Sequence, residues 1–200
     1  MAEIAIEPYR DSFFTDSVAL LAAAYSTNPI NMALFGGAGA KTRDLNRALF
    51  EVTLKHFLPG EKLVACFGDE IVGFAQYVHS PGCRPTRDQT APVIPILHRA
   101  IGEALPRVGE WLRAWREHDP EEPHWHLGTV AVRPDMQGRG IGSLLIEPYC
   151  ASLDVTRELG YLETDRQENL KFYGKAGFSV CGELQVLGVP TWFLRRPHAA

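Results

Sequence analysis

A glycine-rich turn directly after a predicted strand is the feature that most constrains the fold of this chain. The run His124–Val132 is rich in Trp, Thr and Val, which favours a strand, and Pro134 then ends it. An apolar run typical of a helix begins at Ser143, and three glycines precede it at alternate positions, namely Gly138, Gly140 and Gly142. A glycine turn that opens a helix points unpaired backbone N–H groups at one place, at the positive end of the helix dipole. The sequence therefore predicts a phosphate-binding turn.

Two common phosphate-binding motifs fit this turn poorly. A Walker loop requires Gly-Lys followed by Ser or Thr, and the turn contains no such sequence. A Rossmann fingerprint comes closer, because Gly138-x-Gly140 is followed by Ser143 near the place of the third glycine. Glu163 also lies near the expected position of a ribose-binding acid. The five residues 133–137 separate the strand from the first glycine, however, so a nicotinamide-binding oxidoreductase is the less favoured alternative.

Composition sets the class of protein. Two hundred residues that are 46% hydrophobic are enough for one domain with a real core, and the predicted domain spans residues 1–200. The net charge is −4 with both signs interspersed, which predicts no nucleic-acid partner. No 18-residue apolar run and no signal-peptide pattern occur, so no membrane contact and a cytoplasmic location are expected. The four cysteines form no C-x-x-C pair and are expected to be reduced thiols, with no metal site.

Hydrophobic periodicity and turn residues divide the chain into alternating elements. The predicted strands cover Ile4–Ile6, Leu63–Phe67, Ile71–His79, His124–Val132, Tyr161–Thr164, Phe178–Val186 and Pro190–Arg195. The predicted helices cover Asp11–Tyr25, Thr42–Phe57, Ile96–Glu117 with a break or kink at Pro106, Gly140–Leu159 with a cap at Gly160, and Asn169–Ala176. Asn28–Lys41 is predicted to be a mobile loop. This order predicts a mixed α/β sandwich with helices on both faces of one sheet.

Two motifs together resemble the GNAT superfamily of N-acetyltransferases. Gln137-x-x-Gly140-x-Gly142 is similar to the pyrophosphate-binding signature of that superfamily, Gln/Arg-x-x-Gly-x-Gly/Ala. The run Asn169–Phe178 resembles its second signature, an Asn followed by Phe-Tyr-x-Lys-x-Gly-Phe. The resemblance implies the GNAT fold, a mostly antiparallel sheet of about 7 strands flanked by helices. In this fold residues 80–123 would be a helical insertion between the third and fourth strands.

The resemblance also implies acetyl-CoA as co-substrate and a set of residues that bind it. Backbone groups of the strand His124–Val132 would hold the thioester and the pantetheine arm. The glycine turn would hold the pyrophosphate, and the second signature would contact the arm. The residues implied are Val130, Ala131, Val132, Gln137, Gly138, Arg139, Gly140, Ile141, Gly142, Ser143, Asn169 and Tyr173. A bulge at Gly128 would help the strand to part from its neighbour. Helix capping is the alternative role of Asn169.

The resemblance implies one general acid for the reaction and leaves three candidates for the general base. Tyr173 matches the tyrosine that protonates the departing thiolate, and a phenol near pKa 10 and a thiol near 8.5 would exchange a proton efficiently. His126 matches a histidine used by some arylalkylamine acetyltransferases, and His124 lies on the same strand face. Glu163, where the next strand ends, is the rival base, and a chain of water molecules is a third possibility.

The part from Trp125 to Arg196 resembles, more narrowly, the family of puromycin N-acetyltransferase and its bacterial relatives. This implies acetylation of the primary amine of a small molecule, such as an aminonucleoside or an arylalkylamine, and a possible homodimer. The likeness is weaker between Pro29 and Pro123, where the acceptor site would form, so the acceptor stays open. Trp111 and Trp115 would either line that site or form a helix packing face. The alternatives are acetylation of protein N-termini and a non-catalytic acyl-CoA sensor.

Overall fold

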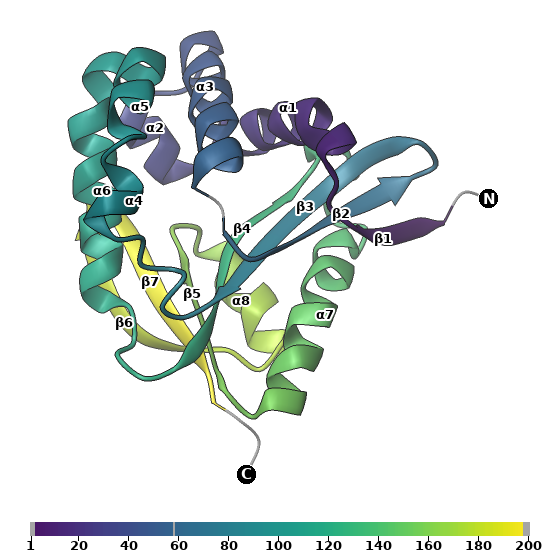
Figure 1. Cartoon of the computed structure of the whole chain (residues 1–200). Helices are drawn as coiled ribbons and strands as arrows, with labels where there is room; N and C mark the ends of the chain where they lie inside the picture. Colours follow the sequence, from purple (N-terminus) through teal and green to yellow (C-terminus); the bar gives the residue numbers. More distant parts are fainter. Residues whose placement is uncertain (1–2, 58, 198–200) are drawn as a thin grey trace.

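The computed structural model describes residues 3–57 and 59–197, and one seven-stranded sheet runs through it (Figure 1). The strands lie in the order β1-β2-β3-β4-β5-β7-β6. Their bounds are Ile4–Pro8, Glu61–Phe67, Glu70–His79, His124–Val132, Leu159–Thr164, Ser179–Val186 and Val189–Arg196 for β1 to β7. Every neighbouring pair is antiparallel except β4 and β5, which are parallel. The predicted fold, a mostly antiparallel sheet of seven strands, is confirmed.

Helices cover both faces of the sheet (Figure 1). The bounds of α1 to α8 are Phe14–Tyr25, Pro29–Phe35, Ala40–His56, Arg87–Thr90, Ile94–Ile101, Leu105–His118, Ile141–Thr156 and Glu168–Lys175. In β3 the side chain of Phe74 packs with α1, whereas its neighbour Ala75 packs with α7. Because successive residues of a strand point to opposite faces, α1 and α7 lie on opposite sides of the sheet. Helices α1 to α6 share the first side, and α7 and α8 the second (Figure 1).

Three local predictions were wrong. The segment predicted as the loop Asn28–Lys41 contains α2, because Asn28 caps the helix through Asn31 N, and Pro29 suits its first turn. The break in the helical insertion comes at Gly102, with φ 52°, and Pro106 lies in the first turn of α6. Gly160 does not cap α7, whose C-cap is Arg157 with φ 55°.

Gly160 lies in β5, directly beneath α7. A Cβ atom there would come within 2.5 Å of Leu153 Cδ1, so glycine permits the close approach of helix and strand. The expected domain of residues 1–200 also includes residues 1–2, 58 and 198–200, which lie outside the described residues. In the described part no single helix is long and apolar enough to cross a membrane, and only the bent pair Asp11–Tyr25 and Pro29–Phe35 passes that test jointly.

The bulge predicted at Gly128 is present in β4. Ala75 of β3 pairs with Val130, and Tyr77 pairs with Leu127, so two residues of β4 face Gln76 alone. A β-bulge of this kind bends its strand and increases the local twist. Gln76 is buried, and its Nε2 donates to the carbonyl of Pro59 at 2.6 Å. The Gln76 amide occupies the space in which a Cβ atom of residue 128 would lie, which explains the glycine.

Gly128→Ala is expected to lower the free energy of unfolding by about 1–3 kcal/mol, because the new methyl group displaces a buried, hydrogen-bonded amide. Urea unfolding measures the change. Gly109→Ala is the matched control: residue 109 lies within α6 with open space around its Cβ position, so that change should stabilise by about 0.5–1 kcal/mol. The cost of Gly128→Ala should shrink when Gln76→Ala is added. Equal costs in both backgrounds would show that Gln76 is not the obstacle.

Candidate active site at the gap between β4 and β5

The parallel strands β4 and β5 pair along only part of their length. His124–Leu127 pairs with Leu159–Leu162, and no pairing continues along the remaining described residues of the two strands. β4 nevertheless extends to Val132 and β5 to Thr164. The separation begins at the bulge, where β4 bends. A gap therefore opens within the sheet, with main-chain atoms on both sides.

The β4 side of this gap carries peptide groups without a strand partner. Arg133 N donates to Val72 O at 2.9 Å, which fixes the alternation of hydrogen bonds between β3 and β4. By that alternation Ala131 bonds to β3, while the peptide groups of Val130 and Val132 point away from it. The side chains of Tyr25 and Gln137 reach the carbonyls of Val130 and Val132 at 3.3 and 3.1 Å. The N–H groups of Val130 and Val132 are thus the ones that face the gap.

The glycine turn lies at the end of β4 and leads into α7. Gly138 and Gly140 adopt φ of 75° and 82°, a left-handed conformation that favours glycine. Among the described residues, the amides of residues 138–142 have no hydrogen-bond acceptor, and a Cβ atom on Gly138 or Gly140 would meet open space. The turn therefore presents free N–H groups at the positive end of a sixteen-residue helix. This geometry fits a pyrophosphate.

The side chains of the turn have different roles. Arg139 and Ser143 are exposed beside the free amides, so either could approach a bound phosphate. Ile141 is buried against the α7 face of the sheet and can contribute only its backbone N–H. Gln137, which the resemblance places in the pyrophosphate site, uses its side-chain amide to bond Val132 O. That bond ties the turn to the end of β4.

Tyr173, on α8, approaches the gap from the α7 side of the sheet. Its ring packs with Leu127 and Leu162, the last paired residues of the two parting strands. Burial raises the pKa of the Tyr173 phenol, and the carboxylates of Asp165 and Glu163 raise it further. The pKa is therefore higher than the value near 10 assumed from the sequence for proton exchange with the thiol. The hydroxyl accordingly keeps its proton at neutral pH and can act as a hydrogen-bond donor.

Asn169 connects α8 to the end of β5. Its Nδ2 donates to Thr164 Oγ1 at 3.0 Å, while its amide oxygen has no donor among the residues described. The N-cap of α8 is Gln167, and Asn169 lies inside the helix. The alternative role of Asn169 as a helix cap was therefore wrong.

Glu163 and His126 lie on the opposite side of the sheet from Tyr173. Glu163 Oε2 accepts from His126 Nε2 at 2.9 Å, and the Glu163 side chain is 1% exposed. Its second oxygen, Oε1, is buried and has no partner in the described part of the chain. Burial lowers the pKa of the His126 imidazolium, but the Glu163 carboxylate, together with Asp119 and Cys83, raises it well above its ordinary value. The two rival bases thus form one hydrogen-bonded pair.

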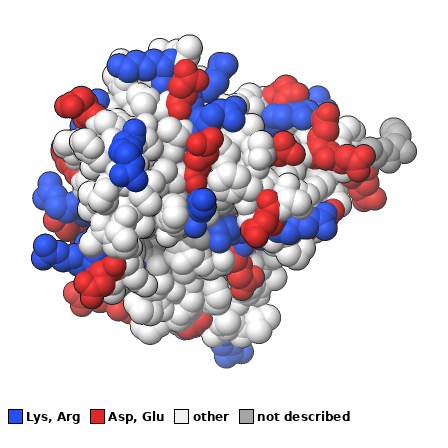
Figure 2. Space-filling view, turned by 45° about the horizontal axis from the view of Figure 1, so that its top comes forward, with Lys and Arg blue, Asp and Glu red and all other residues white. Residues whose placement is uncertain are grey.

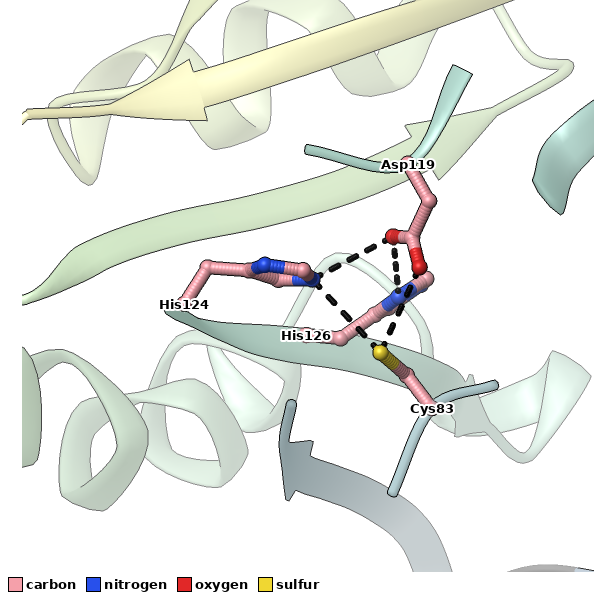
Figure 3. Close-up of side chains that lie close together, drawn as sticks. All are labelled: Cys83, Asp119, His124 and His126. Atoms are coloured by element: carbon pink, nitrogen blue, oxygen red, sulfur yellow. Dashed lines mark hydrogen bonds and ion pairs between the residues drawn. The ribbon is translucent and has the colours of Figure 1, made fainter. Parts of the chain in front are cut away.

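His126 also belongs to a compact group of four side chains, called here the His–Cys cluster (Figure 3). Its members are Cys83, Asp119, His124 and His126. Burial lowers the pKa of His124, but the adjacent Asp119 carboxylate and the Cys83 side chain raise it, and the resulting pKa is about 9. The contact with His124 in turn holds the pKa of Asp119 well below its usual range, although burial acts in the opposite direction. Burial raises the pKa of the Cys83 thiol, but hydrogen bonds with both histidines outweigh it and the net shift is downward.

Sequence reasoning missed four residues near the gap and the cluster, namely Tyr25, Cys83, Asp119 and Asp165. Asp165 follows β5 and accepts from Asn28 Nδ2 and Ile30 N at 2.9 and 2.8 Å, which fixes the start of α2 beside the gap. Cys83 and Asp119 lie at the two ends of the helical insertion. No local motif joins them to the histidines, and the one available signal was the pair of histidines at alternate positions on a strand.

Comparisons with known proteins agree with this geometry. The sequence profile of the Acetyltransferase (GNAT) family matches residues 38–178. Similar solved structures include histone acetyltransferase HPA2 and related acetyltransferase from Corynebacterium glutamicum, with 24% identity, a TM-score of 0.72 and coverage of 100% of this chain and 98% of that one. Arylalkylamine N-acetyltransferase 2 from Aedes aegypti is 15% identical, with a TM-score of 0.69 and coverage of 98% and 100%.

A third similar structure is the ribosomal-protein-S18-alanine N-acetyltransferase from Escherichia coli, 12% identical, with a TM-score of 0.55 and coverage of 99% and 96%. At these identities the likeness shows the fold, and the acceptors named for the three proteins differ from one another. The family profile, in contrast, covers more than half of the chain and includes both the gap and the glycine turn. The chain therefore belongs to the GNAT family and is an acetyltransferase.

Proposed function

We propose that this protein transfers the acetyl group of acetyl-CoA to the primary amine of a small molecule, by direct transfer in a ternary complex. The observation that carries the proposal is the arrangement of groups around the gap. Free backbone amides of β4 line it, Tyr173 approaches from one face of the sheet, and Glu163 lies on the other. A thioester in the gap would have its leaving sulfur on the Tyr173 side and its attacking amine on the Glu163 side. Acetyl-CoA supplies the activated acyl group.

The residues of the chain would divide the binding of acetyl-CoA among three places. The amides of residues 138–142 would hold the pyrophosphate, the N–H groups of Val130 and Val132 would hold the arm and the thioester carbonyl, and the free amide oxygen of Asn169 would accept from the arm. Donors fixed in place before the reaction stabilise the negative charge that develops on the carbonyl oxygen. The proposed binding set is the one that the sequence motifs indicate, with Gln137 supporting the turn.

Glu163 would receive the proton of the attacking amine. Among the described residues its Oε1 has no hydrogen-bond partner, whereas Oε2 accepts from His126, so the carboxylate has one anchored oxygen and one available oxygen. Either the ammonium group itself or a bound water molecule can deliver the proton to Oε1. In this assignment His126 is a positioning residue. Tyr173 would give its hydroxyl proton to the departing thiolate, which forms the thiol of coenzyme A, and would regain a proton from solvent.

The packing of the helical layer favours a small acceptor over a polypeptide. Leu34 of α2, Val108 of α6 and Leu187 of the β6–β7 turn belong to one apolar cluster, and Arg107 Nε donates to Leu34 O at 2.7 Å. These three elements lie beside the route by which an amine would reach the Glu163 side of the gap, and they are packed together rather than separated by a groove. Trp111 packs against the same cluster and contacts Trp115 edge-to-face, with the two ring centroids 4.8 Å apart. The face seen in Figure 2 has acidic and basic side chains intermixed and no single-sign patch.

The decisive experiment is an assay of coenzyme A release from acetyl-CoA with a panel of amines. The panel contains aminonucleosides, arylalkylamines and short peptides with free N-termini. Amine-dependent release with the small molecules supports the proposal. Release with the peptides alone would support N-terminal acetylation instead, and tight acetyl-CoA binding without turnover on any amine would identify a sensor.

Acetyl-CoA should raise the thermal unfolding midpoint by about 5–10 °C at 100 times its Kd, because binding of this strength adds about 2.7 kcal/mol. NADH and ATP, tested beside it, should give no comparable shift.

Gly140→Ala should raise the Kd for acetyl-CoA at least about tenfold, because the new methyl group occupies the space in front of the free amides, where the pyrophosphate would bind. Gly68→Ala is the control, since residue 68 has a similar φ of 60° and open surroundings in a distant turn. Equal affinities in the two variants would place the pyrophosphate elsewhere.

Tyr173→Phe is expected to reduce kcat by about 10²–10⁴, the usual contribution of a general acid, while acetyl-CoA affinity changes little. Stopped assays of product formation at saturating acetyl-CoA measure the effect. Tyr149→Phe is a suitable control, because that buried hydroxyl bonds to the carbonyl of Trp125 and not to the gap. Turnover close to wild type in the Tyr173 variant would remove the tyrosine from the reaction.

Glu163→Gln should also reduce kcat by about 10²–10⁴, because the amide keeps the size of the side chain and an acceptor for His126 but cannot take a proton. Steady-state kinetics with the best amine of the panel test this. A loss of less than about threefold would transfer the role of base to a chain of water molecules, since general bases contribute far more. Tyr173→Phe would still report on the acid in that case.

A further inference from the structure

The His–Cys cluster brings together four metal-ligating atoms from three separate segments (Figure 3). Cys83 lies in the turn after β3, Asp119 follows α6, and the two histidines lie on β4. Asp119 Oδ1 is 3.2 Å from His124 Nε2 and 3.2 Å from His126 Nδ1. Cys83 Sγ is 3.6 Å from His124 Nε2. All four ligand atoms lie within 4.8 Å of one another, and the side chains of His124 and Asp119 are 0% and 4% exposed.

The hydrogen bonds outside the cluster determine which ring nitrogens carry protons. His124 Nδ1 is 2.8 Å from the carbonyl oxygen of Glu122, and His126 Nε2 is 2.9 Å from the carboxylate of Glu163. Both partners can only accept, so both of these nitrogens are N–H donors. A neutral imidazole then has a lone pair on its other nitrogen. In both rings that lone pair points into the cluster, toward Asp119 and Cys83.

Hydrogen bonds within the chain satisfy only part of this group: Cys83 Sγ donates to Asp119 Oδ2 at 3.3 Å and lies 3.6 Å from His124 Nε2. Although Asp119 Oδ1 and His126 Nδ1 are only 3.2 Å apart, both are buried atoms without a correctly aligned hydrogen-bond partner among the residues described. Without a metal, protons on the two rings balance the buried Asp119 carboxylate. A cation at the centre can replace those protons and bind all four atoms at once.

The separations suit tetrahedral coordination. Bonds of about 2.0–2.1 Å to nitrogen or oxygen and about 2.3 Å to sulfur place tetrahedral ligand atoms roughly 3.3–3.6 Å apart. Three of the six separations, at 3.2, 3.2 and 3.6 Å, lie close to that range, and the others are within 4.8 Å. One thiolate, two imidazoles and one carboxylate form a donor set that favours Zn²⁺ over the hard cations Mg²⁺ and Ca²⁺.

We propose that the His–Cys cluster binds one Zn²⁺ ion with all four side chains as ligands. The surroundings have the features of a metal site: Glu122 O and Glu163 orient the two rings, and Arg84 Nε holds Asp119 Oδ2 at 2.7 Å, leaving Oδ1 for the metal. On binding, the Cys83 thiol loses its proton to solvent. The site differs from the expectation of no metal that the cysteine spacing suggested.

Four protein ligands leave no open position, so the ion is structural. It joins the turn after β3 and the segment after α6, which are the two ends of the helical insertion, to β4. Through His126 it also fixes the ring that holds Glu163. The zinc proposal does not depend on acetyl transfer, because it rests on the geometry of the cluster alone.

The first test uses the full-length wild-type protein. Elemental analysis after purification without chelators should find about one Zn²⁺ per chain. Removal of the metal with dipicolinate should lower the thermal midpoint by roughly 5–10 °C, and added Zn²⁺ should restore it. Cobalt substitution should give a thiolate-to-cobalt charge-transfer band and the intense visible bands of tetrahedral Co²⁺. Absence of bound zinc, together with no cobalt spectrum and no effect of dipicolinate, would overturn the proposal.

Variants assign the ligands. Cys83→Ser should abolish the charge-transfer band, whereas Cys150→Ser, at another half-buried free cysteine, should retain it. His124→Asn should lower Zn²⁺ affinity at least tenfold in competition with a chromophoric chelator. If a variant fails to fold, the cobalt spectrum of the wild type still decides whether a thiolate binds the metal. A charge-transfer band that survives Cys83→Ser would overturn the assignment of Cys83.

Discussion

The loss of pairing between β4 and β5 after four residues is the constraint on which the site depends. Peptide groups inside a sheet are normally hydrogen-bonded to neighbouring strands, so they can bind a ligand only where a neighbouring strand separates. The two-residue bulge opposite Gln76 bends β4 at that point, and the glycine at position 128 makes the bulge possible beside the Gln76 amide. The free amides of Val130 and Val132, and the glycine turn that follows them, are consequences of this departure.

The gap also explains how the proposed acid and the proposed base can act from opposite faces of the sheet. Leu127 and Leu162 point toward α7 and α8, and therefore toward Tyr173, whereas His126 and Glu163 point to the other side. In a continuous sheet the backbone would separate these two sets of side chains. Where the strands part, one substrate in the gap can contact both sets, so the proposed proton donor and proton acceptor can act on it from opposite sides.

The sequence predicted the parts of this structure that depend on local signals. Strand alternation, the proline after β4 and the alternate glycines determine conformation within a few residues, and both family motifs fall in such stretches. The helix α2 was missed because its cap, Asn28, is stabilised by Asp165, which is distant in sequence. The His–Cys cluster was missed for the same reason: Cys83 and Asp119 reach the histidines only after the insertion folds back. The raised pKa of Tyr173 likewise comes from burial, which motifs do not encode.

The two halves of β4 carry different groups, and they are connected because they belong to one strand. The first half pairs with β5 and carries His124 and His126, to which the ends of the insertion are joined through Cys83 and Asp119. The second half is free of β5 and faces the gap. Because β4 pairs with β3 on both sides of the bulge, the ends of the insertion are held in place relative to the peptide groups that face the gap. In the proposed reaction the positions of both substrates are therefore set by one strand, which is what direct transfer between them requires.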